Sequence, residues 1–250
     1  MEFRVPVEVL DHIFSFIKSD SGSLSACSSA HPMFAQIVER YFYHHIVIIP
    51  STSYPSDHLS GYTLELSHII KLLSDIPKIV DYVHILEFRR FHSIEDIAPI
   101  MFKFHAVQCI KLTFRPNPGM SSMPRHFKTA LEDCLRSPAL REVHIVDLRY
   151  RFPITILNDL PNITRLSLSG SFEPSTCCID GPFPRLESFS LSRFTLCSRP
   201  GNFHWGNHIV RLRSFTCEYS NEEFLQKFLQ KCSDTLENLD FSMGAYSLCE

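Results

Sequence analysis

The sequence lacks the features that would place the chain in a membrane, in an oxidising compartment or against a polyanion. No apolar run approaches the roughly 20 residues that a membrane-spanning helix needs. The nine cysteines are scattered without a CxxC pair, and their odd number argues against a disulfide framework. The net charge of −3 gives no electrostatic reason to expect nucleic acid or an anionic membrane. Charged residues interrupt the first apolar segment, so we expect no signal peptide and favour the cytoplasm and/or the nucleus.

Signatures of catalysis are missing as well. The eight glycines are scattered, so the chain has neither a dinucleotide fingerprint nor a phosphate-binding loop, and it has no GxSxG or HExxH motif. His105 and Cys109 are four residues apart, but no second pair of ligands follows them in the sequence. We therefore expect no catalytic residue, no cofactor and no metal.

The composition is that of a folded protein. The chain has 250 residues, of which 44% are hydrophobic and 20% charged. This length is sufficient for one or two domains with a real core.

Three short helices are expected at the N-terminus. The segment VPVEVLDHIF (Val5–Phe14) places Pro6 at the first helical position, where its missing N–H is tolerated. Ser23 is expected to cap a second helix, and Pro32 to open a third. Apolar residues recur at helical spacing in the first helix: Val9, Leu10, Ile13, Phe14 and Ile17. Because three short helices make a very small folding unit without disulfides or metal, we expect a protein partner.

A boundary follows this unit. His45–Ile49 reads as a short apolar strand, and Pro50–Tyr62 is rich in Ser, Pro and Tyr, as loops are. The expected division is therefore 1–49 for the helical unit, 50–66 for a linker loop and 67–250 for a second region, which a helix over about Ser67–Ile76 begins.

The second region repeats one pattern, apolar-x-x-apolar-x-apolar. Five of the six intervals between successive starts fall within the roughly 20–29 residues of leucine-rich repeats. Helices are expected in three of the intervals, over Phe127–Leu135, Pro153–Pro161 and Glu222–Ser233. The seven matches are VHILEF (Val83–Phe88), VQCIKL (Val107–Leu112), LREVHI (Leu140–Ile145), ITRLSL (Ile163–Leu168), LESFSL (Leu186–Leu191), LRSFTC (Leu212–Cys217) and LENLDF (Leu236–Phe241). The pattern predicts a solenoid in which each repeat is buried against its neighbours.

The x positions of these strands should face outward on the concave side of the sheet. They read as a basic end, a hydroxyl middle and an acidic end that could bind a target protein; alternatively, Ser and Thr merely suit a solvated strand face. The candidate target-binding residues are Arg89, Lys111, Arg115, His144, Arg165, Ser167, Ser190, Glu218 and Asp240. Further outward positions are Glu142, Ser169, Ser192, Thr216 and Ser242.

The N-terminal segment Val5–Ile48 resembles an F-box, particularly that of the F-box family of mushroom-forming fungi. The resemblance lies in Pro6 and Glu8 at the helix start, in the Leu10/Ile13/Ile17 stripe, in Leu24 and in the helix after Pro32. Ile69–Phe88 and Leu135–Leu148 look like the repeat segments of the same family. Members of that family tend to be longer, which suggests a shortened version here.

The resemblance implies an α/β protein, with a small all-helical F-box followed by a leucine-rich-repeat solenoid with a parallel concave sheet. It implies a substrate-recognition subunit of a Skp–cullin–F-box ubiquitin ligase: the F-box binds the Skp-type adaptor, the repeats bind the target protein, and other subunits catalyse. The adaptor-binding residues that it implies are Pro6, Val9, Leu10, Ile13, Phe14, Ile17 and Leu24.

The alternative is a non-catalytic leucine-rich-repeat scaffold whose N-terminal helices only cap the solenoid, since terminal repeats need a cap. At the other end, only nine residues follow LENLDF, too few for a further repeat. We therefore expect the last repeat, from about Leu212 onward, to be the least protected part of the solenoid.

Overall fold

The fold was analysed in a computed structural model. The residues that it describes are 5–18, 20–50, 62–91, 97–114, 125–153, 160, 162–173, 185–196, 211–218 and 222–242.

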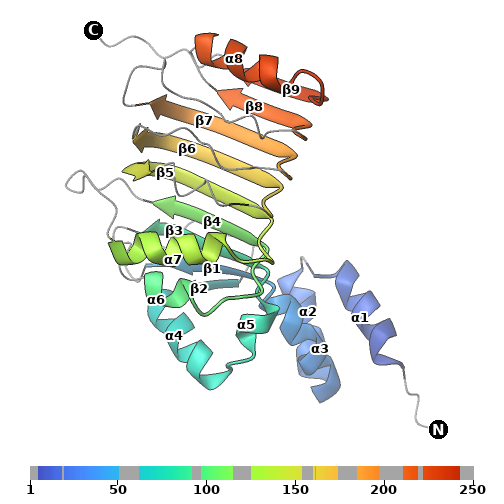
Figure 1. The fold of residues 1–250 in the computed structure, drawn as a ribbon. Helices are drawn as coiled ribbons and strands as arrows, with labels where there is room; N and C mark the ends of the chain where they lie inside the picture. The colour runs from blue at the N-terminus through green and yellow to red at the C-terminus, as the bar shows by residue number, and fades with distance from the viewer. Residues whose placement is uncertain are drawn as a thin grey trace.

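The strands form one parallel sheet of nine in the order β2-β1-β3-β4-β5-β6-β7-β8-β9, so the protein is α/β (Figure 1). From β3 onward each strand pairs with the next in the chain, and each of the seven repeated patterns ends in a strand, as predicted. The strands are β1 (His45–Ile49), β2 (Tyr62–Glu65), β3 (Ile85–Phe91), β4 (Cys109–Phe114), β5 (Glu142–Pro153), β6 (Arg165–Glu173), β7 (Ser188–Leu196), β8 (Ser214–Glu218) and β9 (Asn238–Ser242).

The register aligns equivalent positions of the pattern across the sheet. Because side chains alternate along a strand, every second aligned row points into the core and the rows between point outward. One core row runs from β1 to β9: Ile46, Leu86, Ile110, Val143, Leu166, Phe189, Phe215 and Leu239. The adjacent row, one residue further along each strand, points to the opposite face, and we call it the outer row. It consists of Val47, Glu87, Lys111, His144, Ser167, Ser190, Thr216 and Asp240.

Helices cover the core side of the sheet and share one hydrophobic core with it. The helices expected near 67–76, 127–135 and 222–233 are confirmed; most of the one expected over Pro153–Pro161 lies outside the described residues. The five helices are α4 (Leu66–Asp75), α5 (Ile79–Tyr82), α6 (Ala98–Met101), α7 (Arg125–Leu135) and α8 (Glu222–Cys232). Among the described helices, none has the length and apolarity that crossing a bilayer requires.

The three N-terminal helices, α1 (Val7–Phe16), α2 (Ser21–Ala30) and α3 (Pro32–Phe42), have a core of their own. They project beside the β1–β2 end of the sheet, and α1 lies farthest from it (Figure 1). Pro32 begins α3 as predicted. The cap of α2 differs from the expectation: Asp20 accepts hydrogen bonds from the Gly22 and Ser23 backbone N–H groups, because its carboxylate reaches two of the free N–H groups of the first turn.

The expected boundary needs two corrections. β1 (His45–Ile49) was placed with the helical unit, yet it pairs with β3 inside the sheet. β2 (Tyr62–Glu65) lies where a linker loop was expected, and it pairs in parallel with β1. Sequence reasoning missed this pairing because β1 and β2 do not carry the repeated pattern.

Bulges adjust two strands. Arg90 has a φ of 61°, in the left-handed region, and the register shifts between Arg89 and Phe91. The extra residue lets Phe91 point into the core, where it packs edge-on against Phe88 with the ring centroids 5.9 Å apart. In β6, Gly170 has a φ of 125° at a second register shift, a conformation that side-chain-bearing residues rarely adopt.

Candidate functional site

The outer row gathers residues that are far apart in the sequence. It contains five of the predicted target-binding residues: Lys111, His144, Ser167, Ser190 and Asp240. It also contains Thr216, and Glu87, which had not been predicted. The remaining predicted residues lie on the same face one outward row away: Arg165 beside Glu142, Arg89 beside Thr113, and Glu218 between Ser192 and Ser242. Arg115 lies outside the described residues.

Glu87 is the most deeply placed charge of this face, with 5% of its surface exposed. His45 Nε2 lies 3.3 Å from its Oε2, and Arg89 Nε bonds its Oε1. Burial by itself raises the pKa of Glu87, but the hydrogen bonds from His45 and Arg89 outweigh it and bring the pKa down to about 2. The carboxylate is therefore ionised at neutral pH, and through His45 it joins β3 to β1. The signal was present in the sequence, because Glu87 occupies the outward position between Leu86 and Phe88.

A second polar cluster lies on β4 and β5. Cys109 and Glu142 are register partners, and His144 follows two residues later on the same face. Arg165 Nη1 lies 2.8 Å from Glu142 Oε1, and His144 Nε2 lies 3.6 Å from Glu142 Oε2. Burial raises the pKa of the Cys109 thiol to about 12, and burial lowers the pKa of His144 against the opposing effect of Glu142. Both groups are therefore neutral at pH 7.

These pairs correct the expected charge distribution. The β3–β6 part of the face was expected to be basic, but Arg89 is paired with Glu87 and Arg165 with Glu142. Two carboxylates account for the difference: Glu87, which had not been predicted, and Glu142, which had been predicted to face outward. From β6 onward the face presents hydroxyl groups, as predicted, from Ser167, Ser190 and Thr216, and it ends at the exposed Asp240.

The helix α1 has apolar residues on two faces. Leu10 and Phe14 are buried in the core of the helical unit, together with Leu24 of α2, while Ile17 packs against that core. Val9 and Ile13 point away from it and are 47% and 50% exposed. The residues predicted to bind an adaptor thus divide into two groups: Leu10, Phe14 and Leu24 hold the unit together, and Pro6, Val9 and Ile13 lie on its surface.

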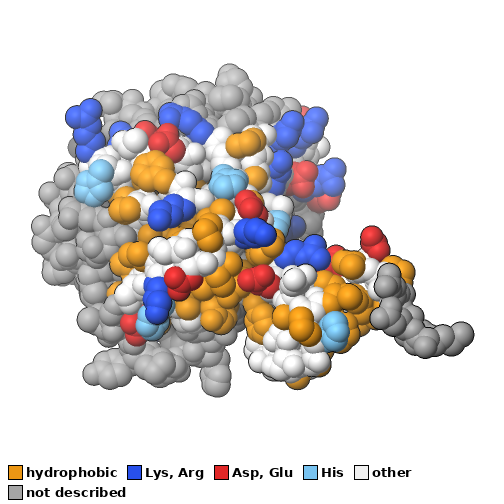
Figure 2. Space-filling view, turned by 90° about the horizontal axis from the view of Figure 1, so that it is seen from below, with side chains coloured by type: hydrophobic (Ala, Val, Ile, Leu, Met, Phe, Trp, Pro, Cys, Tyr) orange, Lys and Arg blue, Asp and Glu red, His pale blue; other side chains and the backbone are white. Residues whose placement is uncertain are grey.

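Phe16 was not included in that set, and it is the most exposed large apolar side chain in the described part of the chain, at 74%. It follows Val9 and Ile13 at helical spacing, so the three form one exposed stripe on α1, which we call the α1 stripe. Figure 2 shows hydrophobic side chains gathered over the projecting helical unit. The spacing was visible in the sequence; the exposure was not.

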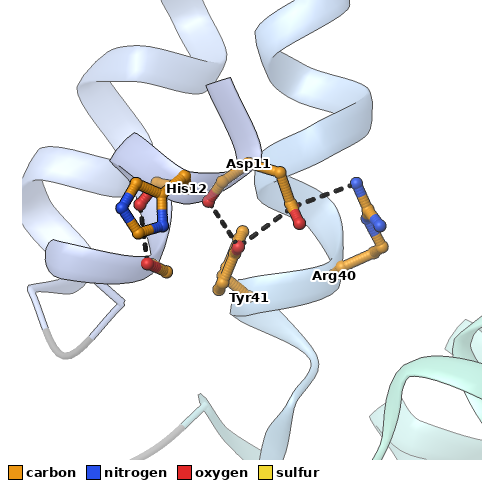
Figure 3. Close-up of polar contacts among 5 residues, drawn as sticks. Asp11, His12, Arg40 and Tyr41 are labelled. Atoms are coloured by element: carbon orange, nitrogen blue, oxygen red, sulfur yellow. Dashed lines mark hydrogen bonds and ion pairs between the residues drawn. The ribbon is translucent and has the colours of Figure 1, made fainter. Parts of the chain in front are cut away.

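Polar contacts hold α1 in this orientation (Figure 3). The Tyr41 hydroxyl of α3 contacts the Asp11 backbone oxygen at 2.7 Å and Asp11 Oδ1 at 2.9 Å. Arg40 Nη2 pairs with the same Oδ1 at 3.1 Å. On the inner side, Phe14 packs edge-on against Phe34 with centroids 5.6 Å apart. The α1 stripe therefore cannot turn inward without breaking these contacts.

The comparisons with known proteins add no family to this geometry. No family model matches the chain, and the search of curated proteins found no match. The fold and the two surfaces define the class: an α/β protein with a nine-stranded parallel sheet and a projecting three-helix unit.

Proposed function

We propose that the chain is an F-box protein with C-terminal leucine-rich repeats and acts as a substrate-recognition subunit of a Skp–cullin–F-box ubiquitin ligase. In this proposal α1–α3 are the F-box and bind a Skp-type adaptor. The outward face of the sheet binds the protein to be ubiquitinated. Catalysis belongs to other subunits, so the chain itself is not an enzyme, and it works in the cytoplasm and/or the nucleus.

The α1 stripe is the observation that carries the proposal. A helix of a small unit buries one apolar face in its own core, yet α1 also exposes Val9, Ile13 and Phe16. Burying each such side chain fully is worth about 1.5–3 kcal/mol, so a partner that covers the stripe gains several kcal/mol. An amphipathic helix that packs into the groove of a partner protein uses such residues.

The sheet supports the second half of the proposal. Seven consecutive parallel strands carry the same pattern and occur in chain order, as expected for stacked repeats. Their outward rows present charged, hydroxyl and acidic groups in sequence, which suits the recognition of a polar protein surface. Cys27, Cys109, Cys134 and Cys217 are free thiols, in keeping with a reducing compartment.

The alternative is a binding scaffold in which α1–α3 only cap the repeats. A cap would share its apolar residues with the end of the repeat core. The described buried residues instead form two separate clusters, and the α1 stripe faces away from the sheet core. This arrangement favours a partner over a cap.

The test is co-purification with a Skp-type adaptor. Val9→Asp with Ile13→Asp places two charges in the proposed interface, where each unpaired charge costs several kcal/mol. We expect adaptor binding to be lost while circular dichroism of the free chain stays unchanged, because both side chains lie on the surface. The wild-type chain should bind the adaptor at a one-to-one ratio.

Ile70 provides the matched control. It is an isoleucine of α4 with 49% exposure, almost equal to the 50% of Ile13, and it lies outside the helical unit. Ile70→Asp should therefore bind the adaptor like the wild type. Full binding by the Val9/Ile13 double variant, or absence of binding by the wild type, would refute the F-box assignment and favour the scaffold.

A further inference from the structure

The sheet register brings together three side chains that could not be grouped from the sequence. Cys109 begins β4 and Glu142 begins β5, and the two are aligned as parallel neighbours. His144 lies two positions after Glu142, so its side chain emerges on the same face of the sheet. One sulfur, one carboxylate oxygen and one imidazole nitrogen of these residues all lie within 4.8 Å of one another.

We propose that Cys109, Glu142 and His144 form a binding site for a divalent transition-metal ion, with zinc as the preferred ion. The proposal revises the expectation of a metal-free chain, which rested on the sequence spacing of His105 and Cys109. In the structure His105 is not part of the site, since its Nε2 pairs with Asp81 Oδ1 at 3.1 Å. The metal-site proposal does not depend on the proposed function.

The distances between the three ligand atoms are close to those required around a single zinc ion. Zinc bond lengths and tetrahedral angles place pairs of ligand atoms about 3.4–3.6 Å apart. His144 Nε2 and Glu142 Oε2 are 3.6 Å apart, which is longer than a good hydrogen bond but matches two ligands of one ion. Cys109 Sγ lies within 4.8 Å of both, so it needs to approach by at most about 1 Å, which side-chain rotation can supply.

The surroundings orient the ligands. Arg165 Nη1 pairs with Glu142 Oε1 at 2.8 Å, while Oε2 of the same carboxylate faces His144 Nε2. Such partners, which fix a ligand without touching the metal, are typical of metal sites. Glu142 and His144 are half-buried and Cys109 is buried, so the site is closed on the sheet side and reachable from the outward face.

The ligand chemistry selects the ion. A thiolate and an imidazole favour zinc and related transition metals over magnesium and calcium, which prefer oxygen ligands. On binding, the metal displaces the thiol proton, so a thiolate and a carboxylate balance the two positive charges of the ion. Three protein ligands leave a fourth tetrahedral position for water or for a side chain of a bound protein.

The test uses the full-length chain with zinc and with cobalt as probes. After dialysis against zinc we expect one zinc ion per chain by mass spectrometry. Cobalt should give the visible bands of a four-coordinate ion and a thiolate-to-cobalt charge-transfer band in the near ultraviolet. Cys109→Ser should abolish the charge-transfer band and weaken zinc binding by at least about 100-fold. Arg165→Gln should weaken it by about 10–100-fold, as for the loss of a group that orients a ligand.

Cys134 provides the matched control, because it is a partly buried free thiol on α7 outside the site. Cys134→Ser should keep both the band and the affinity. His144→Gln is a second variant at a partly exposed position, and it should lose at least about 100-fold in affinity even if Cys109→Ser fails to fold. The proposal is overturned if the folded chain binds no stoichiometric zinc, or if the band survives Cys109→Ser or the affinity survives His144→Gln.

Discussion

The helical unit and the sheet each bury apolar side chains in a core of their own, but the two cores differ greatly in size. In the described residues, five buried hydrophobic side chains form the core of α1–α3, whereas thirty-seven form the core shared by the sheet and its helices. A unit of about 40 residues cannot bury enough surface to be stable by a wide margin, while a stack of repeats adds a core layer with every strand. The comparison agrees with the difference in exposure: α1 leaves Val9, Ile13 and Phe16 exposed, whereas the core row of the sheet is buried from β1 to β8.

The largest effect is expected in the helical unit. Leu24 lies in the core of this unit and is 1% exposed. Leu24→Ala should lower the free energy of unfolding by about 2–5 kcal/mol, which is comparable to the whole stability of so small a unit. We expect the amides of α1–α3 to lose protection in hydrogen exchange while those of β4–β7 keep theirs.

Val9→Ala is the control on the neighbouring helix, because Val9 is half exposed and its truncation leaves the core intact. Protection in α1–α3 should change little with this variant. Loss of protection in β4–β7 with Leu24→Ala would show that the two regions unfold as one and would break the comparison.

The next effect is expected in the sheet, at Glu87. Its pKa is about 2 in the folded protein and 4.5 ordinarily, so its ionisation stabilises the fold above pH 4.5 and this stabilisation is lost as the pH falls towards 2. The difference corresponds to about 3 kcal/mol. Glu87→Gln should lower the free energy of unfolding at pH 7 by about that amount, measured by urea denaturation.

The same variant should also flatten the acid dependence of stability between pH 4.5 and 2. Glu237→Gln is the control, since Glu237 is a carboxylate with 62% side-chain exposure and a loose ion pair to Arg213 at 3.8 Å. An acid dependence that persists unchanged in Glu87→Gln would mean that other carboxylates of the sheet are responsible.

A smaller effect is expected where α1 meets α3. Tyr41→Phe removes the hydroxyl that contacts two Asp11 oxygens and should lower the stability of the helical unit by about 1 kcal/mol. Arg40→Ala removes an ion pair between two half-exposed groups and should cost less, about 0.5 kcal/mol or below. Equal losses in thermal unfolding would contradict the view that the partly buried Tyr41 hydroxyl, rather than the ion pair, holds α1.

The smallest effect is expected at the last strand. Leu239 is the register partner of Phe215, yet Leu239 is 50% exposed and Phe215 is fully buried. Leu239→Ala should therefore change stability by less than about 1 kcal/mol, whereas Phe215→Ala should cost about 3–5 kcal/mol.

Hydrogen exchange tests the same end of the sheet without a substitution. Amides from about Leu212 onward should exchange well before those of Ile163–Leu191, because β9 pairs with one strand and its side chains are exposed. Uniform protection through Phe241 would show that this end of the sheet is closed.

Much of the sheet could be read from the sequence, because a strand's pattern determines which residues share a face. The alternation in LRSFTC and LESFSL predicts Phe215 and Phe189 in the core and Thr216 and Ser190 outside it, and the register confirms this. The helix starts at Pro32 and near Leu66 were also readable, because proline and the apolar spacing act locally. The joining of β1 and β2 to the sheet was not, since it depends on a long-range pairing without a repeated pattern.

The sequence by itself determined the periodicity: helices with apolar stripes at the N-terminus, then strands with one apolar and one polar face. The tertiary structure decided which of two apolar faces of α1 is buried, because Leu10 and Phe14 have the same spacing as Val9 and Ile13. It also decided that Glu87 meets His45 and that Cys109 meets Glu142. Spacing along a chain determines which way a side chain points, but its neighbours across a sheet come from segments that are distant in the sequence, and only the register of folded strands brings them together.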